Sequence, residues 1–246
     1  MKNANQWTPS KFVLRNGRLL ASRDPREVGV GSRLVADRVA GVYEAHLPAH
    51  ARGRLVDLGC GRVPLYEAYK DLVSENVCVD WGNSLHKSEH LDFECDLCGR
   101  LPFQDGEFNT ILLSDVLEHV SEPEHLWTEM ARILKPGGKL LLNVPFCYGV
   151  HEAPHDFYRY TEFALRRFAE MSGFRTIVLQ PIGGAPEVLM DILAKHLQSI
   201  PLLGRPLASA LQAITQALVR AGPGRKISEK TARSHPLGYF MVVERI

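Results

Sequence analysis

Short apolar runs recur along the chain, separated by stretches in which apolar residues return every three or four positions. The runs are rich in leucine and β-branched residues, as expected of strands that are covered on both faces. They lie at Leu55–Leu58, Val77–Asp80, Thr110–Leu113, Lys139–Val144, Thr176–Leu179 and Phe240–Val243. Because helical patterns lie between most of them, the alternation predicts right-handed crossovers and a doubly wound, mainly parallel sheet in an α/β fold.

Two of the intervening helices carry recognisable boundary residues. Thr161 can cap a helix that Gly173 ends. Ser121, with Glu124 three residues later, has the spacing of a capping box for the helix that stops at "KPGG".

The length of 246 residues suits one large α/β domain. We expect a single domain with an N-terminal helical extension, a core, a helical insertion and a final strand. The corresponding bounds are 1–50, 51–183, 184–235 and 236–246.

Both added regions show apolar residues at helical spacing. In the extension, Val35, Val39, Val42 and Tyr43 predict a helix laid on the sheet. Between residues 186 and 220 the pattern predicts two leucine-rich helices, with Leu189, Leu193, Leu197 and Ile200 in one and Leu207, Leu211, Ile214 and Leu218 in the other. A membrane-surface helix would carry more Lys and Arg on its polar face, so we expect these stripes to pack on their own domain or to form a homodimer.

The charge balance gives no sign of a polyanionic partner. Twenty-nine basic and 28 acidic residues leave a formal net charge of +1, and no basic stripe with interleaved aromatics is present, which argues against nucleic acid. Residues 1–10 lack the apolar core of a signal peptide, and no apolar run has the length of a membrane span. We therefore expect a cytoplasmic protein without a transmembrane segment.

The five cysteines are an odd number, which suits reduced thiols better than a disulfide framework. Cys95 and Cys98 form a single CxxC, preceded by His86 and His90. A zinc site could be drawn from these four residues, but without a second CxxC a loop with two thiols is the simpler interpretation.

The stretch "RLVDLGCGRVPLYEAY" passes from an apolar run through an acid into two closely spaced glycines. Gly59 and Gly61 remove side chains that would hold a ligand away from the backbone N–H groups, and we expect Asp57 at the start of this turn. Asp80 ends the next run about 20 residues downstream, a separation at which a carboxylate can reach a ribose diol. Trp81 could stack on a purine, although aromatic residues after strands more often only pack.

Together, "VDLGCG", "VCVDW", "CDLCGRLPFQDGEFNTILLSDVLEHV" and "LWTEMARILKPGGKLLLNVPF" resemble the class I S-adenosylmethionine-dependent methyltransferases, specifically the type 11 group. The resemblance covers roughly residues 53–174, and "PLGYFMVVERI" is similar to the final strand of that family. It implies a seven-stranded, mostly parallel Rossmann-like sheet and S-adenosyl-L-methionine as the cofactor. It also implies a set of cofactor-binding residues: Asp57, Gly59 and Gly61 beside the methionine part, Asp80 at the ribose, Asp96 and Leu97 at the adenine, and Ser114 near the methionyl end.

Two other functions remain open. A dinucleotide-binding turn would carry a third glycine where this chain has Val63 and Pro64, which disfavours an NAD-dependent oxidoreductase. S-adenosylmethionine has no phosphate, so a turn that binds it can do without the third glycine. The other alternative is a cofactor-binding scaffold or regulator that lost catalysis and dimerises through residues 186–220.

The stretch "FCYGVHEAPHDFYRYT" follows the fifth strand, where an acceptor should meet the methyl group. Aligning the acceptor with the methyl carbon can supply most of the rate, but a hydroxyl acceptor also needs a base, for which histidine is the leading candidate. We expect His151 or His155 as this base and Tyr148, Tyr158 or Arg159 as substrate-binding residues, although packing explains the last two equally well. Similar stretches in type 11 relatives of sugar and glycan pathways imply a small-molecule, sugar or lipid-linked acceptor.

The segment "SDVLEHV" raises the question of a metal. Asp115, Glu118 and His119 match an arrangement in ubiquinone-pathway O-methyltransferases that use magnesium, and at this spacing they could share one helical face. Because "EH" after this strand is common in type 11 members in general, we expect no metal.

Overall fold

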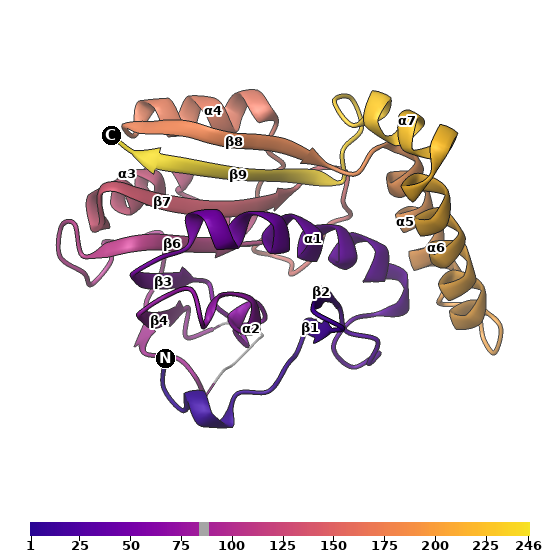
Figure 1. Ribbon diagram of the computed structural model, residues 1–246, viewed down its shortest axis with the longest axis horizontal. Coiled ribbons are helices and arrows are strands. Elements are labelled where there is room, and N and C mark those ends of the chain that lie inside the picture. Colours follow the sequence, from indigo (N-terminus) through magenta and orange to yellow (C-terminus); the bar gives the residue numbers. More distant parts are fainter. Residues whose placement is uncertain (84–88) are drawn as a thin grey trace.

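The computed structural model describes residues 1–83 and 89–246 (Figure 1). A large sheet contains β3 (Arg54–Leu58), β4 (Glu75–Asp80), β5 (Phe93–Glu94), β6 (Phe108–Ser114), β7 (Leu134–Pro145), β8 (Phe174–Ile182) and β9 (Gly238–Arg245). Its order is β5-β4-β3-β6-β7-β9-β8, and only the pairs that involve β9 are antiparallel. The prediction of a seven-stranded, mostly parallel sheet is confirmed.

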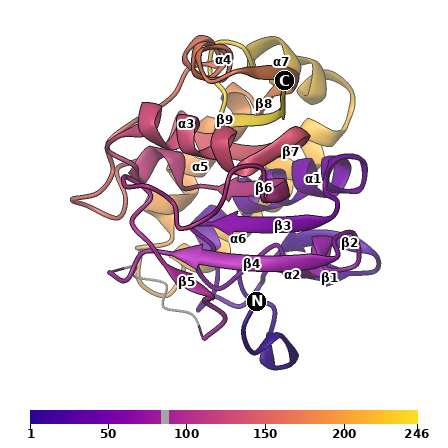
Figure 2. The same cartoon turned by 90° about the vertical axis from the view of Figure 1, so that its left-hand side faces the viewer.

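The helices are α1 (Arg33–His50), α2 (Tyr66–Tyr69), α3 (Pro123–Ile133), α4 (Glu162–Met171), α5 (Ala185–Leu197), α6 (Gly204–Arg220) and α7 (Gly222–Thr231). Figure 2 shows α1 and α3 on opposite sides of the sheet. Short 3₁₀ turns lie at η1 (Ala4–Gln6), η2 (Val30–Ser32) and η3 (Leu117–His119). Among the residues described, no helix is both long enough and apolar enough to cross a membrane.

Two cores explain why the strands are continuous apolar runs. In β6, Ile111 and Leu113 belong to the core that contains Trp127 of α3, whereas Leu112 belongs to the core that contains Tyr43 of α1. Successive side chains of a strand point to opposite faces, so a strand with helices on both sides must be apolar throughout.

The extension contains the predicted helix and a hairpin that we did not predict. Val39 and Tyr43 of α1 are buried against the sheet, as their spacing indicated. Before this helix, β1 (Phe12–Arg15) and β2 (Arg18–Ala21) pair through the two residues Asn16 and Gly17, both with positive φ. Asn-Gly between alternating strands is the strongest short hairpin signal, so the information was present in the sequence.

The two helices predicted between residues 186 and 220 are present as α5 and α6, and a third helix, α7, follows them in the insertion. The orientation of their apolar residues differs from the prediction. Leu207, Ile214 and Leu218 are exposed, while Ala208 and Gln212 lie on the buried side of α6. Leu189, Leu193 and Ile200 are exposed as well, and of the two predicted stripes Leu197 and Leu211 alone are partly buried. The expectation that these stripes pack on their own domain is therefore wrong for most of their members. Figure 1 shows α5, α6 and α7 together at the end of the molecule toward which the arrows of β7 and β8 point.

Of the two predicted caps, one is correct. The Thr161 hydroxyl accepts a hydrogen bond from the Ala164 N–H at 3.2 Å and begins α4. The capping box at Ser121 is wrong: α3 begins at Pro123 without a side-chain cap, and the Ser121 carbonyl accepts a hydrogen bond from the Tyr158 hydroxyl.

Candidate functional site

Two cavities meet at the carboxyl edge of the parallel strands. The glycine cavity, about 340 Å³, lies over the turn after β3 and is lined by residues that include Gly59, Gly61, Asp80, Trp81, Asp96, Leu97 and His155. The extension cavity, about 310 Å³, lies under residues 27–39 and is lined by residues that include Lys11, Val35, Val39, Glu118, Tyr148 and His151. Both cavities share Asp115, His119 and Glu152, so a group in one can reach a group in the other.

The glycine turn needs its glycines for two reasons. Gly59 has φ +70°, and a Cβ there would lie 2.5 Å from Cγ2 of Val116. Gly61 has φ +48°, and its N–H donates a hydrogen bond of 2.7 Å to the Asp80 carboxylate. The turn is therefore fixed to the end of the next strand and leaves its backbone open to the cavity.

Val63 stands where a dinucleotide turn would have its third glycine, and it adopts a left-handed backbone with φ +51°. Such a conformation costs a non-glycine residue about 1–2 kcal/mol. The side chain is fully buried and the carbonyl accepts a hydrogen bond of 3.1 Å from the Trp7 indole, so packing holds the residue in place.

Acidic side chains follow successive strands around this cavity. Asp80 accepts the Trp81 N–H at 2.7 Å, and Asp96 accepts the Cys98 N–H at 2.9 Å. The Trp81 ring lies 5.0 Å from the ring of His155 in an edge-on arrangement. The residues that the sequence assigned to the ribose and adenine ends are thus brought together in one cavity.

Two residues of that predicted set line neither cavity. Asp57 does not begin the turn; it lies within β3, fully buried, where it accepts a 3.4 Å hydrogen bond from Tyr69 and where burial raises the pKa of its carboxyl to about 8. The Ser114 hydroxyl donates to the Asn143 side-chain oxygen at 2.8 Å. Asp57 thus lies inside β3 rather than at the turn, and Ser114 lies at the end of β6. Their assignment to the methionine part of the cofactor stays a prediction.

The extension cavity depends on residues that sequence reasoning missed. Lys11 reaches across from the extension and its ammonium group lies 2.7 Å from the Asp115 carboxylate. Asn143 of β7 donates to the same carboxylate and accepts a 2.8 Å hydrogen bond from Tyr43. No local pattern could have identified these contacts, since they join residues 28, 100 and 104 positions apart.

Glu118 is a buried carboxyl group that faces two imidazoles. Its Oε1 lies 3.8 Å from His119 Nε2 and 4.0 Å from His151 Nε2. Neither carboxylate oxygen has a hydrogen-bond partner within the described residues. Burial, together with the nearby Asp115, raises the pKa of Glu118 well above its ordinary value and favours the uncharged acid.

His151 is poised as a neutral base. Burial is the main cause that lowers its pKa from 6.5, with the neighbouring His119 adding to the effect. Its ring also lies 5.1 Å from the Tyr148 ring. His155, the other candidate, lies instead in the glycine cavity.

Glu118, His119 and His151 could also hold a metal ion. Their ligand atoms lie within 4.8 Å of one another, and in residues 1–83 and 89–246 no other such group of three was found. Asp115 is not a member, because Lys11 and Asn143 bind its carboxylate. The arrangement of Asp115, Glu118 and His119 considered from the sequence is therefore not formed. Two imidazoles and a carboxylate suit zinc, manganese or iron better than magnesium.

The CxxC residues form no ligand cluster in the part of the chain that is described. Cys98 Sγ contacts the Ser121 hydroxyl at 3.4 Å, and Cys95 Sγ lies 3.4 Å from the Asp96 carbonyl oxygen. His86, the fourth residue of the zinc hypothesis, lies outside the described residues.

Tyr158 and Arg159 line neither cavity. The Tyr158 hydroxyl donates to the Ser121 carbonyl at 3.1 Å, and Arg159 holds the loop that carries Tyr148 and His151. The Arg159 guanidinium pairs with Asp156 at 2.6 and 2.7 Å and lowers the pKa of that carboxyl. Asp156 in turn accepts the His151 N–H at 2.9 Å. Their contacts favour the packing alternative, whereas Tyr148 lines the extension cavity.

Residues 56–142 match the family model described as "Methyltransferase domain". A demethylmenaquinone methyltransferase of Renibacterium salmoninarum is 32% identical over 115 residues, 45% of this chain and 45% of that protein. A ubiquinone biosynthesis O-methyltransferase of Xanthomonas oryzae pv. oryzae is 34% identical over 103 residues, 38% of this chain and 43% of that protein. The matched stretch thus covers less than half of either relative.

Among solved structures, geranyl diphosphate C-methyltransferase of Streptomyces coelicolor A3(2) has a TM-score of 0.54. That structure contains Mg²⁺, geranyl diphosphate and S-adenosyl-L-homocysteine; it is 15% identical, with 91% of this chain and 85% of the other covered. At this identity the likeness shows the shared fold.

Proposed function

Since the chain belongs to the class I S-adenosylmethionine-dependent methyltransferases of the type 11 group, we propose that it transfers a methyl group from S-adenosylmethionine to a hydroxyl of a small-molecule acceptor. When bound, this cofactor supplies a methyl group on a sulfonium whose leaving group is neutral. The chain's own task is to hold donor and acceptor in line and to take up a proton.

The observation that carries this proposal is the contact of the two cavities along Asp115, His119 and Glu152. The glycine cavity fits the donor, because its bare turn and two loop carboxylates match a molecule with an amino-acid tail, a ribose and an adenine. We assign Asp80 to the ribose hydroxyls and Asp96 to the adenine amino group. The extension cavity then receives the acceptor.

We assign the base to His151 rather than to His155. His151 lines the extension cavity and its lowered pKa keeps Nε2 free to accept a proton at neutral pH. In the step, the acceptor oxygen forms a bond to the methyl carbon while the carbon–sulfur bond breaks, and the hydroxyl proton passes to the imidazole. Tyr148, beside the His151 ring, positions the acceptor.

The acceptor cavity combines an apolar wall with a polar end. Val28, Val35 and Val39 of the extension supply apolar lining, while Glu118 and His151 of the core supply polar lining. This lining suits a compact hydroxylated ring, free or lipid-linked, and two of the similar proteins are named for quinone biosynthesis. A sugar or glycan precursor is the alternative acceptor. The five free thiols suit a reducing compartment, and we propose the cytoplasm.

Calorimetry with S-adenosylhomocysteine tests the donor site without any acceptor. We expect micromolar binding that Asp80→Ala weakens at least tenfold and that Asp105→Ala, an exposed acid paired with Arg132, leaves unchanged. Retention of NAD in place of S-adenosylhomocysteine would instead support the oxidoreductase alternative.

Turnover separates an enzyme from a binding scaffold. The protein is incubated with S-adenosylmethionine and three acceptor sets, namely catechols and hydroquinones, their prenylated forms, and sugars, and methylated products are detected by mass spectrometry. Methylation of the ring hydroxyls is expected. Donor binding without methylation of any set would favour the scaffold.

A further inference from the structure

The insertion presents apolar side chains to solvent on a surface that we call the insertion face: Ile200, Leu202, Leu203, Leu207, Ile214 and Leu218. The turn between α5 and α6 contributes its tip, where Leu202 is 95% and Leu203 66% exposed. Along α6, Leu207, Ile214 and Leu218 are 50–60% exposed and follow one another at helical spacing. Large apolar side chains gathered in this way indicate an interaction site.

The outward orientation of these side chains is fixed by contacts on the other side of the helices. The Gln198 side chain accepts the Gly31 N–H at 2.8 Å, and the Gln212 side chain accepts the Leu34 N–H at 3.0 Å. A Cβ on Gly31 would lie 2.8 Å from the Lys195 backbone, so the fit there is close. Rotating α5 or α6 to bury the leucines would leave these polar groups without their partners.

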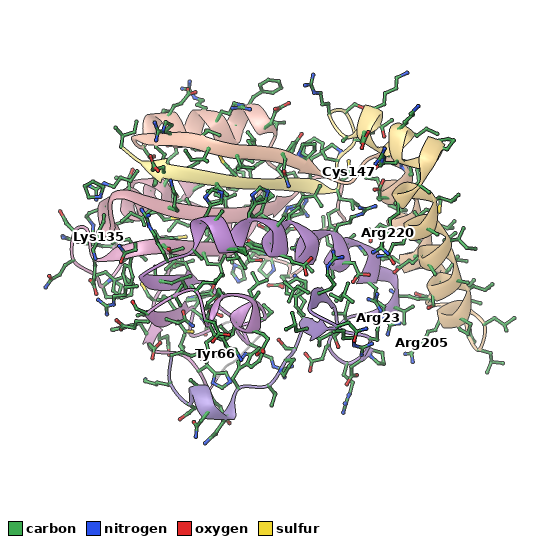
Figure 3. The ribbon with its side chains drawn as sticks, viewed as in Figure 1. Arg23, Tyr66, Lys135, Cys147, Arg205 and Arg220 are labelled. Atoms are coloured by element: carbon green, nitrogen blue, oxygen red, sulfur yellow. The ribbon has the colours of Figure 1, made fainter. Side chains whose placement is uncertain are left out.

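The exposed charges of the insertion are mostly positive. Residues 184–235 are all described; their exposed side chains include six cations, Arg205, Arg220, Arg225, Lys226, Lys230 and Arg233, but a single acid, Glu229. Figure 3 labels Arg205 and Arg220 on α6, and Arg220 lines a cavity with Asp37 of α1, so it lies on the side of α6 that faces α1. This local excess contrasts with a net charge of +1 for the whole chain.

The other two acids of this region do not offset the cations at the surface. Glu187 is buried and pairs with Arg38 at 3.0 Å, and Asp191 is buried and pairs with Lys195 at 2.6 Å. The outward charge of the insertion is therefore strongly positive.

We propose that the insertion face docks on an anionic lipid bilayer. Leucine side chains of the insertion face enter the acyl boundary, while the exposed lysines and arginines elsewhere on the insertion are attracted to anionic headgroups, by about 1 kcal/mol for each cation near the surface. A second copy of this chain fits less well, because a twofold contact would bring two cationic surfaces together. From the sequence, the two leucine-rich helices carry too few lysines and arginines for a membrane-surface helix. In the structure, α7 and the two ends of α6 supply these cations.

Vesicle sedimentation tests this docking with no methyl donor present, so its result is independent of methyl transfer. Wild-type protein is mixed with vesicles of phosphatidylcholine containing 30% phosphatidylglycerol, or of phosphatidylcholine alone. We expect binding to the anionic vesicles that is at least tenfold stronger and that falls as salt rises.

Two variants and their matched controls locate the contact. Leu202→Ser with Leu203→Ser should weaken binding at least tenfold, and Lys226→Gln with Lys230→Gln at least fivefold. Phe163→Ser, an exposed phenylalanine of α4, and Lys135→Gln, an exposed lysine at the opposite end of the molecule in Figure 3, should change it less than twofold. Unchanged S-adenosylhomocysteine affinity and unfolding temperature show that each variant is folded.

Three results would overturn the proposal. The first is absence of wild-type binding to anionic vesicles, and the second is equal binding by the folded tip variant. The third is a dimer in light scattering that the tip variant abolishes while vesicles remain unbound, which would assign the insertion face to a second copy.

Discussion

The ammonium group of Lys11 and the carboxylate of Asp115 lie 2.7 Å apart, although 104 residues separate them in the sequence. Asp115 has φ +53° and lines both cavities. The ion pair therefore ties the extension to the boundary between the two cavities.

Lys11→Met should impair the acceptor more than the donor. Without the ion pair, the segment before β1 loses its anchor over the extension cavity, so the KM of the acceptor should rise about tenfold. The dissociation constant of S-adenosylhomocysteine should change less than threefold. Lys2→Met, at an exposed lysine of the same segment, is the control, and a larger effect on donor binding than on KM would contradict this role.

Exchange of the two loop histidines should have unequal effects. His151→Gln should lower kcat by about 10²–10⁴-fold, the usual contribution of a general base. His155→Gln should mainly alter donor binding, through the loss of its contact with Trp81. Steady-state kinetics with the identified acceptor separates the two, and equal kcat values would reject His151 as the base.

The pH profile of kcat should reflect the lowered pKa of His151. A base acts in its neutral form, and a lowered pKa keeps it neutral to more acidic pH, so the acidic limb should lie below the ordinary value of 6.5. His151→Gln should remove that limb. A limb that persists unchanged in the variant would belong to another group.

Asp57→Asn should flatten the dependence of stability on pH. The carboxyl titrates near 3.8 when unfolded and at about 8 when folded, so the native state binds the extra proton between these values. The stability that this group contributes is greatest below about pH 4. It falls by about 1.4 kcal/mol per pH unit as the pH rises from there, and it is lost once the pH has passed about 8. Urea unfolding at several pH values measures the slope, which should be smaller in the variant.

Gly59→Ala should destabilise the fold by about 2 kcal/mol or more, from the left-handed backbone and the clash with Val116. Adding Val116→Ala removes the clash but not the backbone cost. In urea unfolding, the double variant should therefore lose less than the sum of the two single losses. Strict additivity would show that the valine does not limit this position.

The lining of the glycine cavity was largely predictable because its signals are local. Gly59, Gly61, Asp80 and Asp96 each follow a strand, and in a parallel sheet the strand ends share one edge. Asp57 was misplaced because an acid inside a buried strand looks like an acid at its end. Its burial is tolerated through a raised pKa, which no spacing reveals.

The extension cavity and the insertion were less predictable for a different reason. The spacing of apolar residues identifies an apolar stripe on a helix, but it does not show whether that stripe faces the core or the solvent. On α6 the buried positions include Ala208 and Gln212, and the amide of Gln212 bonds to Leu34, a contact over 178 residues. Contacts of that range, like the one made by Lys11, arise only when the whole chain is folded.

The two cavities differ in the part of the chain that contributes most to their walls. The glycine cavity is lined by loops of the core, whereas Val28, Val35 and Val39 of the first 50 residues line the extension cavity together with core residues. Replacing the extension with a different segment of similar length on the same sheet should therefore change the choice of acceptor while the methyl donor stays the same. This makes the extension the natural place to engineer new selectivity.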